Sequence, residues 1–456
     1  MGGPGMDRAV LLLTVFCGVL PPVAAANDLL AAYQEAKVRD AVLAVATFQR
    51  SGAEEVLPAA RAAFLPQVTS VANAAREKEA YASSLSGPYN SAQNGSDTTT
   101  GYVSTYGITV SQTLWDLEGF RRIKEAGMQV AQAQATYRGV EQALILRIAQ
   151  AYFGILSAAD RVATAESQRK AFGELLRQAQ VREQQGLSAR TDVAEAQSFY
   201  DSTDQSVIDA EDVLEDAKRG LTEITGRYPQ EVAPLEEDIP LAAPTPSSAD
   251  EWAELARQDN PDVIVASLGV EAAQRDMQVQ RAKYWPTLAL QGSASHTQEP
   301  LALGGNESVN GIALQLNWPI YQGGAIQSQV RQATATYEQA RAQLDVVQRH
   351  ADREARLAFR GVASGVARVQ AARRAVESGR NAVEASRLSV EFGARNEFDL
   401  LNQQNDYYSA VRAYKQSRYD YLTAMLQLKF QAGNLHETDL ARVDDLLVQA
   451  SAAGTP

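Results

Sequence analysis

Three charged residues follow a glycine in EFGARNEFDL, residues 391–400, within a region that otherwise favours uninterrupted helix. A carboxylate pair such as Glu397 and Asp399 can perform acid and base catalysis when both groups point at one reacting bond. Helical positions two residues apart do not face the same direction, so this spacing argues against a catalytic pair. These acids and Arg395 therefore need another explanation.

The rest of the sequence does not favour an enzyme either. His296, His350 and His436 have no partners at metal-ligand spacing, and we expect each on the solvated surface. No G-x-S-x-G motif, phosphate-binding loop or Cys/His pair occurs. The tyrosines within residues 405–422 recur at helical spacing, which is typical of packing. We expect no catalytic residue, no metal and no cofactor.

Composition and charge exclude one class of partner. Of 456 residues, 45% are hydrophobic and 21% are charged, which is typical of a folded chain. The formal net charge of −13 argues against nucleic acid, because its binding needs a basic surface.

The N-terminus reads as an export signal, with residues 1–26 as the signal peptide. A short basic start, an apolar core and a small-residue cleavage site occur in MDRAVLLLTVFCGVLPPVAAA, residues 6–26. A membrane anchor is the alternative, but this apolar run is too short to span a bilayer. Phe16 precedes the single cysteine, Cys17, where a lipoprotein needs a small residue. We expect a mature chain from near Asn27 without lipid or disulfide, and no membrane-spanning helix after it.

Proline placement leaves room for very long helices. No proline occurs between Pro88 and Pro229, or between Pro319 and Pro456, and proline inside a helix costs about 3 kcal/mol. A heptad-like apolar seam lies in the first run, formed by Ala126, Val130, Ala133, Tyr137, Val140 and Leu144. A soluble helical bundle would explain the seam. It would not explain the length, because roughly 70 helical residues span about 100 Å.

Alternating segments predict two β-hairpins, at 66–115 and 286–321. The expected strands are 66–84, 101–115, 286–297 and 310–321, with one apolar face that includes Ile108, Leu114 and Leu316. Four strands are too few for a membrane barrel, which needs about eight. Several chains would therefore have to share one barrel.

The two halves of the chain repeat each other. A shift of 207 residues places Gly186 on Gly393 and Asp192 on Asp399. Glycine supplies the backbone freedom that ends a helix, and an aspartate near the start of the next helix suits its dipole. A plain helical-hairpin turn would explain these two residue types but not Arg395.

This repeat divides the sequence into expected regions. Residues 27–226 form the first repeat, with its helical tip near 186–192, and 261–436 form the second, with its tip near 393–399. A linker at 227–260 joins them, and residues 437–456 form the tail.

Four motifs carry a resemblance to the TolC family of outer-membrane channel proteins, over roughly residues 28–440. These motifs are LNWPIYQGGAIQSQVRQA (316–333), LTEITGRYP (221–229), GLSARTDV (186–193) and FGARNEFDLLN (392–402). The resemblance implies an α+β fold and a homotrimer. Long coiled-coil helices would form a periplasmic tunnel, and each chain would give four strands to a shared 12-stranded outer-membrane β-barrel. The linker and tail would form an equatorial band, the tail being partly disordered.

The resemblance also implies a gate at the helical tips. Arg395 matches the gating arginine of the family, Asp399 its first lumen-facing aspartate, and Thr191 and Asp192 the polar partners on the adjacent hairpin. Asn402 stands where the family has a second lumen aspartate. Val390 likewise stands where the family has a gating tyrosine, so the constriction should carry fewer charges and links.

The implied partners are those of an export duct. An inner-membrane ABC or proton-driven exporter would dock through a periplasmic adaptor at Gly186, Leu187 and Gly393, and the cargo would be a protein or a drug. A periplasmic coiled-coil adaptor is the alternative function. Adaptors normally carry one helical hairpin, so the duplicated β-hairpins favour the channel.

Overall fold

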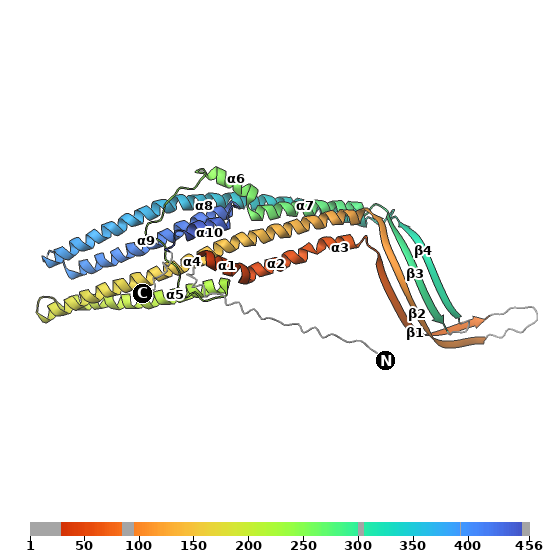
Figure 1. The fold of residues 1–456 in the computed structure, drawn as a ribbon, viewed down its shortest axis with the longest axis horizontal. Coiled ribbons are helices and arrows are strands. Elements are labelled where there is room, and N and C mark those ends of the chain that lie inside the picture. The colour runs from red at the N-terminus through yellow and green to blue at the C-terminus, as the bar shows by residue number, and fades with distance from the viewer. Residues whose placement is uncertain (1–28, 84–94, 300–304, 393, 449–456) are drawn as a thin grey trace, which may run out of the picture.

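The computed structural model describes residues 29–83, 95–299, 305–392 and 394–448; the expected signal peptide lies outside these ranges. The chain is elongated, with two helical hairpins ending at one end and a sheet at the other (Figure 1). The charged tips therefore lie at the opposite end of the chain from the β-hairpins, and the long helices between them begin close to the sheet (Figure 1).

Helices make up most of the described chain, and the long ones come in two matched pairs. Helix α4 has 68 residues and α8 has 67, and the returning helices α5 and α9 have 36 and 35. The helices are α1 (Leu29–Arg39), α2 (Ala41–Glu54), α3 (Val56–Ala62), α4 (Leu117–Gln184), α5 (Arg190–Thr225), α6 (Ala249–Asp259), α7 (Pro261–Ala282), α8 (Ala325–Glu391), α9 (Glu397–Gln431) and α10 (Glu437–Asp444). This confirms the long helices expected from proline placement.

The repeat is visible in the backbone as well as in the sequence. Gly226 follows α5 and Gly433 follows α9, and both adopt φ of 69°. A side chain at Gly433 would collide with the backbone of Asp259, because a Cβ there would lie 1.9 Å from its carbonyl oxygen. Glycine at this position is therefore required by both conformation and space.

One helix, α4, contains an 18-residue window that is long and apolar enough to cross a membrane, with mean hydropathy 1.3. Of that window, 56% is buried inside the chain. Its buried members include Leu144, Ile148 and Tyr152, which pack in the central core. Burial of this kind is typical of a core helix.

The sheet has four antiparallel strands in the order β1-β2-β3-β4. The strands are β1 (Gln67–Ser83), β2 (Gly95–Asp116), β3 (Thr287–Glu299) and β4 (Gly305–Asn317). The predicted hairpins are confirmed, but the predicted end of the fourth strand at residue 321 is wrong. Pro319 cannot donate a ladder hydrogen bond, and Gly323 and Gly324 turn the chain with φ of 61° and 85° into α8.

Register across the sheet separates an apolar face from a polar one. Val68, Val110, Gly292 and Ile312 lie opposite one another in a row across the four strands. The neighbouring row on the other face contains Thr69, Thr109, Ser293 and Gly311. Two faces of opposite polarity are typical of barrel strands in a membrane.

The predicted alternation along the second strand is interrupted at Leu114. Leu114 lies in a β-bulge between Thr113 and Trp115, and Trp115 is the residue that pairs with Leu288. The extra residue of a bulge has no partner across the ladder, so strict alternation ends at this point.

The core lies midway along the helices. Tyr152 of α4 and Tyr421 of α9 are fully buried there. The segment between α5 and α6 crosses α9, where Arg418 donates to the carbonyls of Glu236 and Glu237 at 3.1 and 3.0 Å. This strap, residues 226–248, is held by these backbone carbonyls and also by its own side chains. Leu235 and Ile239 are buried in the core, and Asp238 accepts from Arg373 of α8 at 2.9 Å.

The C-terminal segment closes the same region. Helix α10 contributes Leu440 and Val443 to the core, and Leu447 forms a bridge with Leu235. Disorder, one expectation for the tail, is therefore wrong as far as residue 448; residues 449–456 lie outside the described chain.

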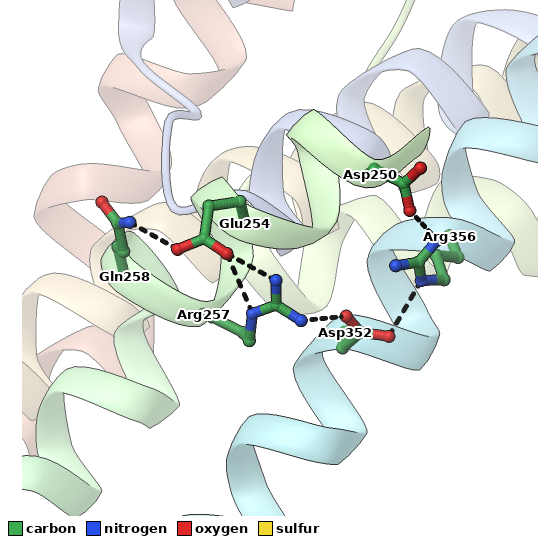
Figure 2. Close-up of polar contacts among 6 residues, drawn as sticks. All are labelled: Asp250, Glu254, Arg257, Gln258, Asp352 and Arg356. Atoms are coloured by element: carbon green, nitrogen blue, oxygen red, sulfur yellow. Dashed lines mark hydrogen bonds and ion pairs between the residues drawn. The ribbon is translucent and has the colours of Figure 1, made fainter. Parts of the chain in front are cut away.

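Helix α6 is held on α8 by a network of ion pairs (Figure 2). Asp352 of α8 accepts from Arg257 Nη1 of α6 at 2.7 Å and from Arg356 Nε at 2.9 Å. Arg356 Nη1 then reaches back to Asp250 of α6 at 2.7 Å. The network joins the chain between the two repeats to the longest helix of the second repeat.

Candidate channel constriction at the helical tips

The first tip is a tight helix end. Gly186 has φ of 72°, the Leu187 amide donates to the Arg182 carbonyl at 2.8 Å, and the Gly186 amide donates to that of Glu183 at 2.9 Å. This is the Schellman arrangement that the predicted glycine allows. Leu187 remains 73% exposed, so it projects from the end of the molecule.

Asp192 is bound within its own turn. Its carboxylate accepts from the Ser188 hydroxyl at 2.6 Å, the Ala189 amide at 3.2 Å and the Thr191 hydroxyl at 3.4 Å. The hydrogen bond from Ser188 is the main cause that lowers the pKa of Asp192 below its usual value. The carboxylate therefore stays ionised and caps the start of α5.

The second tip repeats this design with different residues. The Ala394 amide donates to the Ser389 carbonyl at 2.8 Å, 207 residues after the equivalent bond of the first tip. Asn396 caps α9 by accepting from the Asp399 amide at 2.9 Å. The predicted docking residue Gly393 lies outside the described residues. Phe392 beside it is 82% exposed.

Arg395 does not reach the first tip of its own chain. Its guanidinium donates to the Ser386 hydroxyl at 3.4 Å. The Asp192 carboxylate instead accepts hydrogen bonds from Ser188 and Thr191 of its own turn. Pairing between Arg395 and these two residues therefore stays a prediction about neighbouring chains.

Asp399 and Asn402 lie one turn apart at the start of α9. Asn402 donates to the Phe398 carbonyl at 3.0 Å, and Asp399 makes no ion pair with any residue in the described ranges. Val390 lines a cavity of about 240 Å³ together with Arg182 and Glu397. Among described residues there is no group of three metal-ligating side chains, here or elsewhere.

Sequence reasoning missed the contacts that join the two tips of one chain. Glu397 forms an ion pair with Arg182 at the end of α4. Phe398 of α9 packs edge-on against Phe199 of α5 at 6.2 Å, and Leu401 enters the apolar cluster of the first hairpin. These partners are about 200 residues apart in the chain, so no local sequence pattern predicts their contacts.

The geometry therefore shows two charged, exposed helical tips opposite a sheet with one apolar face. The family model described as outer membrane efflux protein matches residues 32–227 and 252–434. These two segments cover both repeats and leave out most of the strap.

Full-length relatives agree with this match. The proteases secretion protein PrtF of Dickeya chrysanthemi is 30% identical, covering 96% of this chain and 95% of PrtF. TolC of Vibrio cholerae is 28% identical, covering 95% and 97%. Among solved structures, CusC superposes with a TM-score of 0.75 at 18% identity, covering 90% and 92%. The adaptor alternative is thereby set aside, and the chain belongs to the outer membrane efflux protein family, the TolC-type channels that serve efflux and type I secretion across the outer membrane and extend into the periplasm.

Proposed function

We propose that three copies of this chain close into one channel that exports cargo through a gate at the helical tips. The open edges of the sheet carry this proposal. Strands β1 and β4 each pair on one side only within the described chain. An unpaired edge in lipid leaves backbone groups unsatisfied at several kcal/mol each. Pairing of β1 with β4 of the next copy satisfies both edges.

The helices support the same closure. Helix α5 packs mainly on α4, and α8 packs on α7 and α9, so their outer flanks face away from the chain. Apolar side chains remain exposed on these flanks, including Ile208 on α5 and Val346 on α8, at 56% and 59%. Burying such residues against a neighbouring copy would gain about 1.5–3 kcal/mol for each side chain fully covered.

Native mass spectrometry of the protein extracted in detergent tests closure. We expect particles of three chains. A monomer that remains folded would contradict the shared barrel, because its sheet would then be stable with two free edges.

At the tips, we assign Arg395 to hold the resting channel shut by pairing with Thr191 and Asp192 of the neighbouring chain. Within the described residues, the Arg395 guanidinium donates to the Ser386 hydroxyl alone, at 3.4 Å. An exposed pair contributes only about 0–1 kcal/mol, but three equivalent pairs must all break before the tip widens.

Asp399 is assigned to line the constriction. Three unpaired carboxylates around a narrow pore attract cations, and Asn402 adds no charge to this ring. Asp399→Asn should reduce cation preference and block by divalent cations in bilayer recordings. Unchanged reversal potentials would place Asp399 away from the pore.

We assign docking of a periplasmic adaptor to Gly186, Leu187 and Gly393. The adaptor would connect the channel to an ABC or proton-driven exporter of the inner membrane. The exposure of Leu187 supports this surface. Leu187→Asp should weaken adaptor crosslinking and export while leaving trimer insertion intact. Unchanged crosslinking would contradict the assignment.

The relatives favour protein as the cargo, since PrtF and AprF are both described as protease secretion proteins. Deletion of the gene should remove specific proteins from the culture medium. Loss of drug resistance alone, with secretion unchanged, would instead favour small-molecule efflux.

A further inference from the structure

A cavity between α4 and α9 carries an excess of positive charge in a chain of formal net charge −13. The cavity has a volume of about 310 Å³ and is lined by three cations, Arg161, Arg412 and Lys415, but by one carboxylate, Asp160. Since a water molecule takes about 30 Å³, the space is large enough for a phosphate or a carboxylate side chain.

The one carboxylate is already engaged by other groups. Asp160 accepts from Lys415 Nζ at 2.7 Å and from the Tyr419 hydroxyl at 2.7 Å. The next acid along α9, Asp420, accepts from the Gln416 amide at 2.8 Å. Neither carboxylate is bound to Arg161 or Arg412. Asp209 of α5 lines a second cavity with both arginines but forms no ion pair with either.

Arg412 and Arg161 have only neutral partners or none. Arg412 donates to the Gln168 side-chain oxygen at 2.8 Å and to the Ser409 hydroxyl at 2.9 Å. The Arg161 guanidinium makes no hydrogen bond or ion pair with any residue that the structure describes. Burial, followed by the positive charge of Arg161, lowers the pKa of Arg412. Burial and the neighbouring charge both destabilise the charged form of Arg412, and a bound anion would offset both effects.

No residue of the strap lines this cavity. The strap contacts α9 at Tyr414 and Arg418, through the carbonyls of Glu236 and Glu237. Ser157 and Gln416 also line the cavity, but the Ser157 hydroxyl donates to the Gln416 side-chain oxygen and the Gln416 amide donates to Asp420, so the two guanidiniums are the donors left for a ligand.

We infer that Arg161 and Arg412 bind an anionic group, a phosphate or a carboxylate, in the cavity between α4 and α9. Guanidinium groups suit both anions, because their donors form a planar fork that can bind two oxygens at once. The anion can come from free phosphate or from acidic side chains of an exported polypeptide. This inference does not depend on trimer closure or on the gate.

Thermal unfolding of the purified full-length protein, with inorganic phosphate as the probe at constant ionic strength, tests the site. Phosphate should raise the Tm of the wild type in a saturable manner, because a ligand that binds only the folded state stabilises it. Arg161→Gln and Arg412→Gln should each weaken the apparent affinity for phosphate at least tenfold.

A second readout separates binding from a purely structural role. Arg161→Gln removes a repelling charge and no contact, so without phosphate its Tm should equal or exceed that of the wild type. Arg169→Gln is the matched control on α4, because Arg169 is bound to Asp204 at 3.1 Å; its phosphate response should be that of the wild type.

A tetra-aspartate peptide, compared with tetra-asparagine, distinguishes the two sources of the anion. Competition with phosphate by the acidic peptide alone would show that the site accepts protein carboxylates, and binding of phosphate alone would show that it selects the free ion. The inference is overturned if neither probe raises the Tm of the wild type, or if both arginine variants respond as the wild type does.

Discussion

Arg182 and Glu397 form the ion pair that joins the two helical hairpins of one chain at their tips. Arg182 is 39% exposed and Glu397 is 18% exposed. Water screens such a partly exposed pair, which limits its contribution to about 1 kcal/mol. The pair lines the same cavity as Val390 and supplies a link between the two hairpins within one chain.

Glu397→Gln should therefore loosen the tips and increase leak conductance modestly, by less than tenfold for up to about 1 kcal/mol per chain. Bilayer recording together with hydrogen exchange of the peptides at 182–190 and 394–400 would measure both effects. Glu174→Gln is the matched control, because Glu174 pairs with Arg177 inside α4 alone. Equal behaviour of the two variants would show that the ion pair does not hold the tips.

Asp192 gives the first tip a defined dependence on pH. Its pKa is lower in the folded protein than in the unfolded chain, chiefly because Ser188 donates to the ionised form. The carboxylate therefore contributes stability above its unfolded pKa, near 3.8, and this contribution is lost as pH falls through the lower folded value.

Asp192→Asn should accordingly lower the Tm near pH 7, and the difference from the wild type should shrink below about pH 4. Thermal unfolding from pH 7 to pH 3 would show this convergence. Glu195→Gln, an exposed position on the next turn of α5, is the control. A difference that stays constant over this range would mean that ionisation of Asp192 is irrelevant.

Among the secondary-structure elements, α6 is linked to α8 through Asp352, which accepts hydrogen bonds from both Arg257 and Arg356 (Figure 2). Asp352→Asn should weaken both arginine contacts and speed hydrogen exchange across residues 249–259 several-fold. Asp345→Asn provides the control, since Asp345 pairs with Arg349 of its own helix and with no α6 residue that the structure describes. Unchanged exchange in α6 would show that its apolar face, with Trp252 buried, holds it without the ion pairs.

The helices and β-hairpins were predictable where the pattern of neighbouring residues determines the local structure. Absence of proline predicted α4 and α8, alternation predicted the two hairpins, and Gly186 predicted a helix end. Prediction failed where distant residues decide the outcome. The bulge at Leu114 is visible only from the pairing of Trp115 with Leu288 of another strand. The bonds from Arg418 to two backbone carbonyls of the strap likewise leave no pattern in the strap's sequence.

The candidate site was predictable only in part for the same reason. Asp192 and Asp399 stand at the helix starts where the repeat placed them. The link between Glu397 and Arg182 depends on two hairpins lying side by side, which requires the folded chain. The proposed partners of Arg395 would lie on a second chain, which one sequence does not position.

At the scale of the whole molecule, the sheet should tolerate charge on one face only. Ile108 and Leu316 are exposed on the apolar face, at 52% and 64%. If this face meets lipid, Ile108→Asp or Leu316→Asp places a carboxylate there at a cost of up to a few kcal/mol near the bilayer centre. Trimer yield in the outer membrane should fall for both variants.

Gln315→Glu is the control for this prediction, because residue 315 lies on the opposite face of β4 from Leu316. Its trimer yield should match that of the wild type. Normal yield from both aspartate variants would contradict the assignment of the apolar face to lipid.

We propose a channel of three chains that Arg395 keeps narrow at its tips. Single-channel recording of purified trimers in planar bilayers tests this gate. The wild type should show a small conductance at low and high salt. Arg395→Ser should raise the conductance several-fold, because three equivalent contacts between neighbouring chains are lost at once. Equal conductance of Arg395→Ser and the wild type at both salts would contradict the gate and leave closure to helix packing.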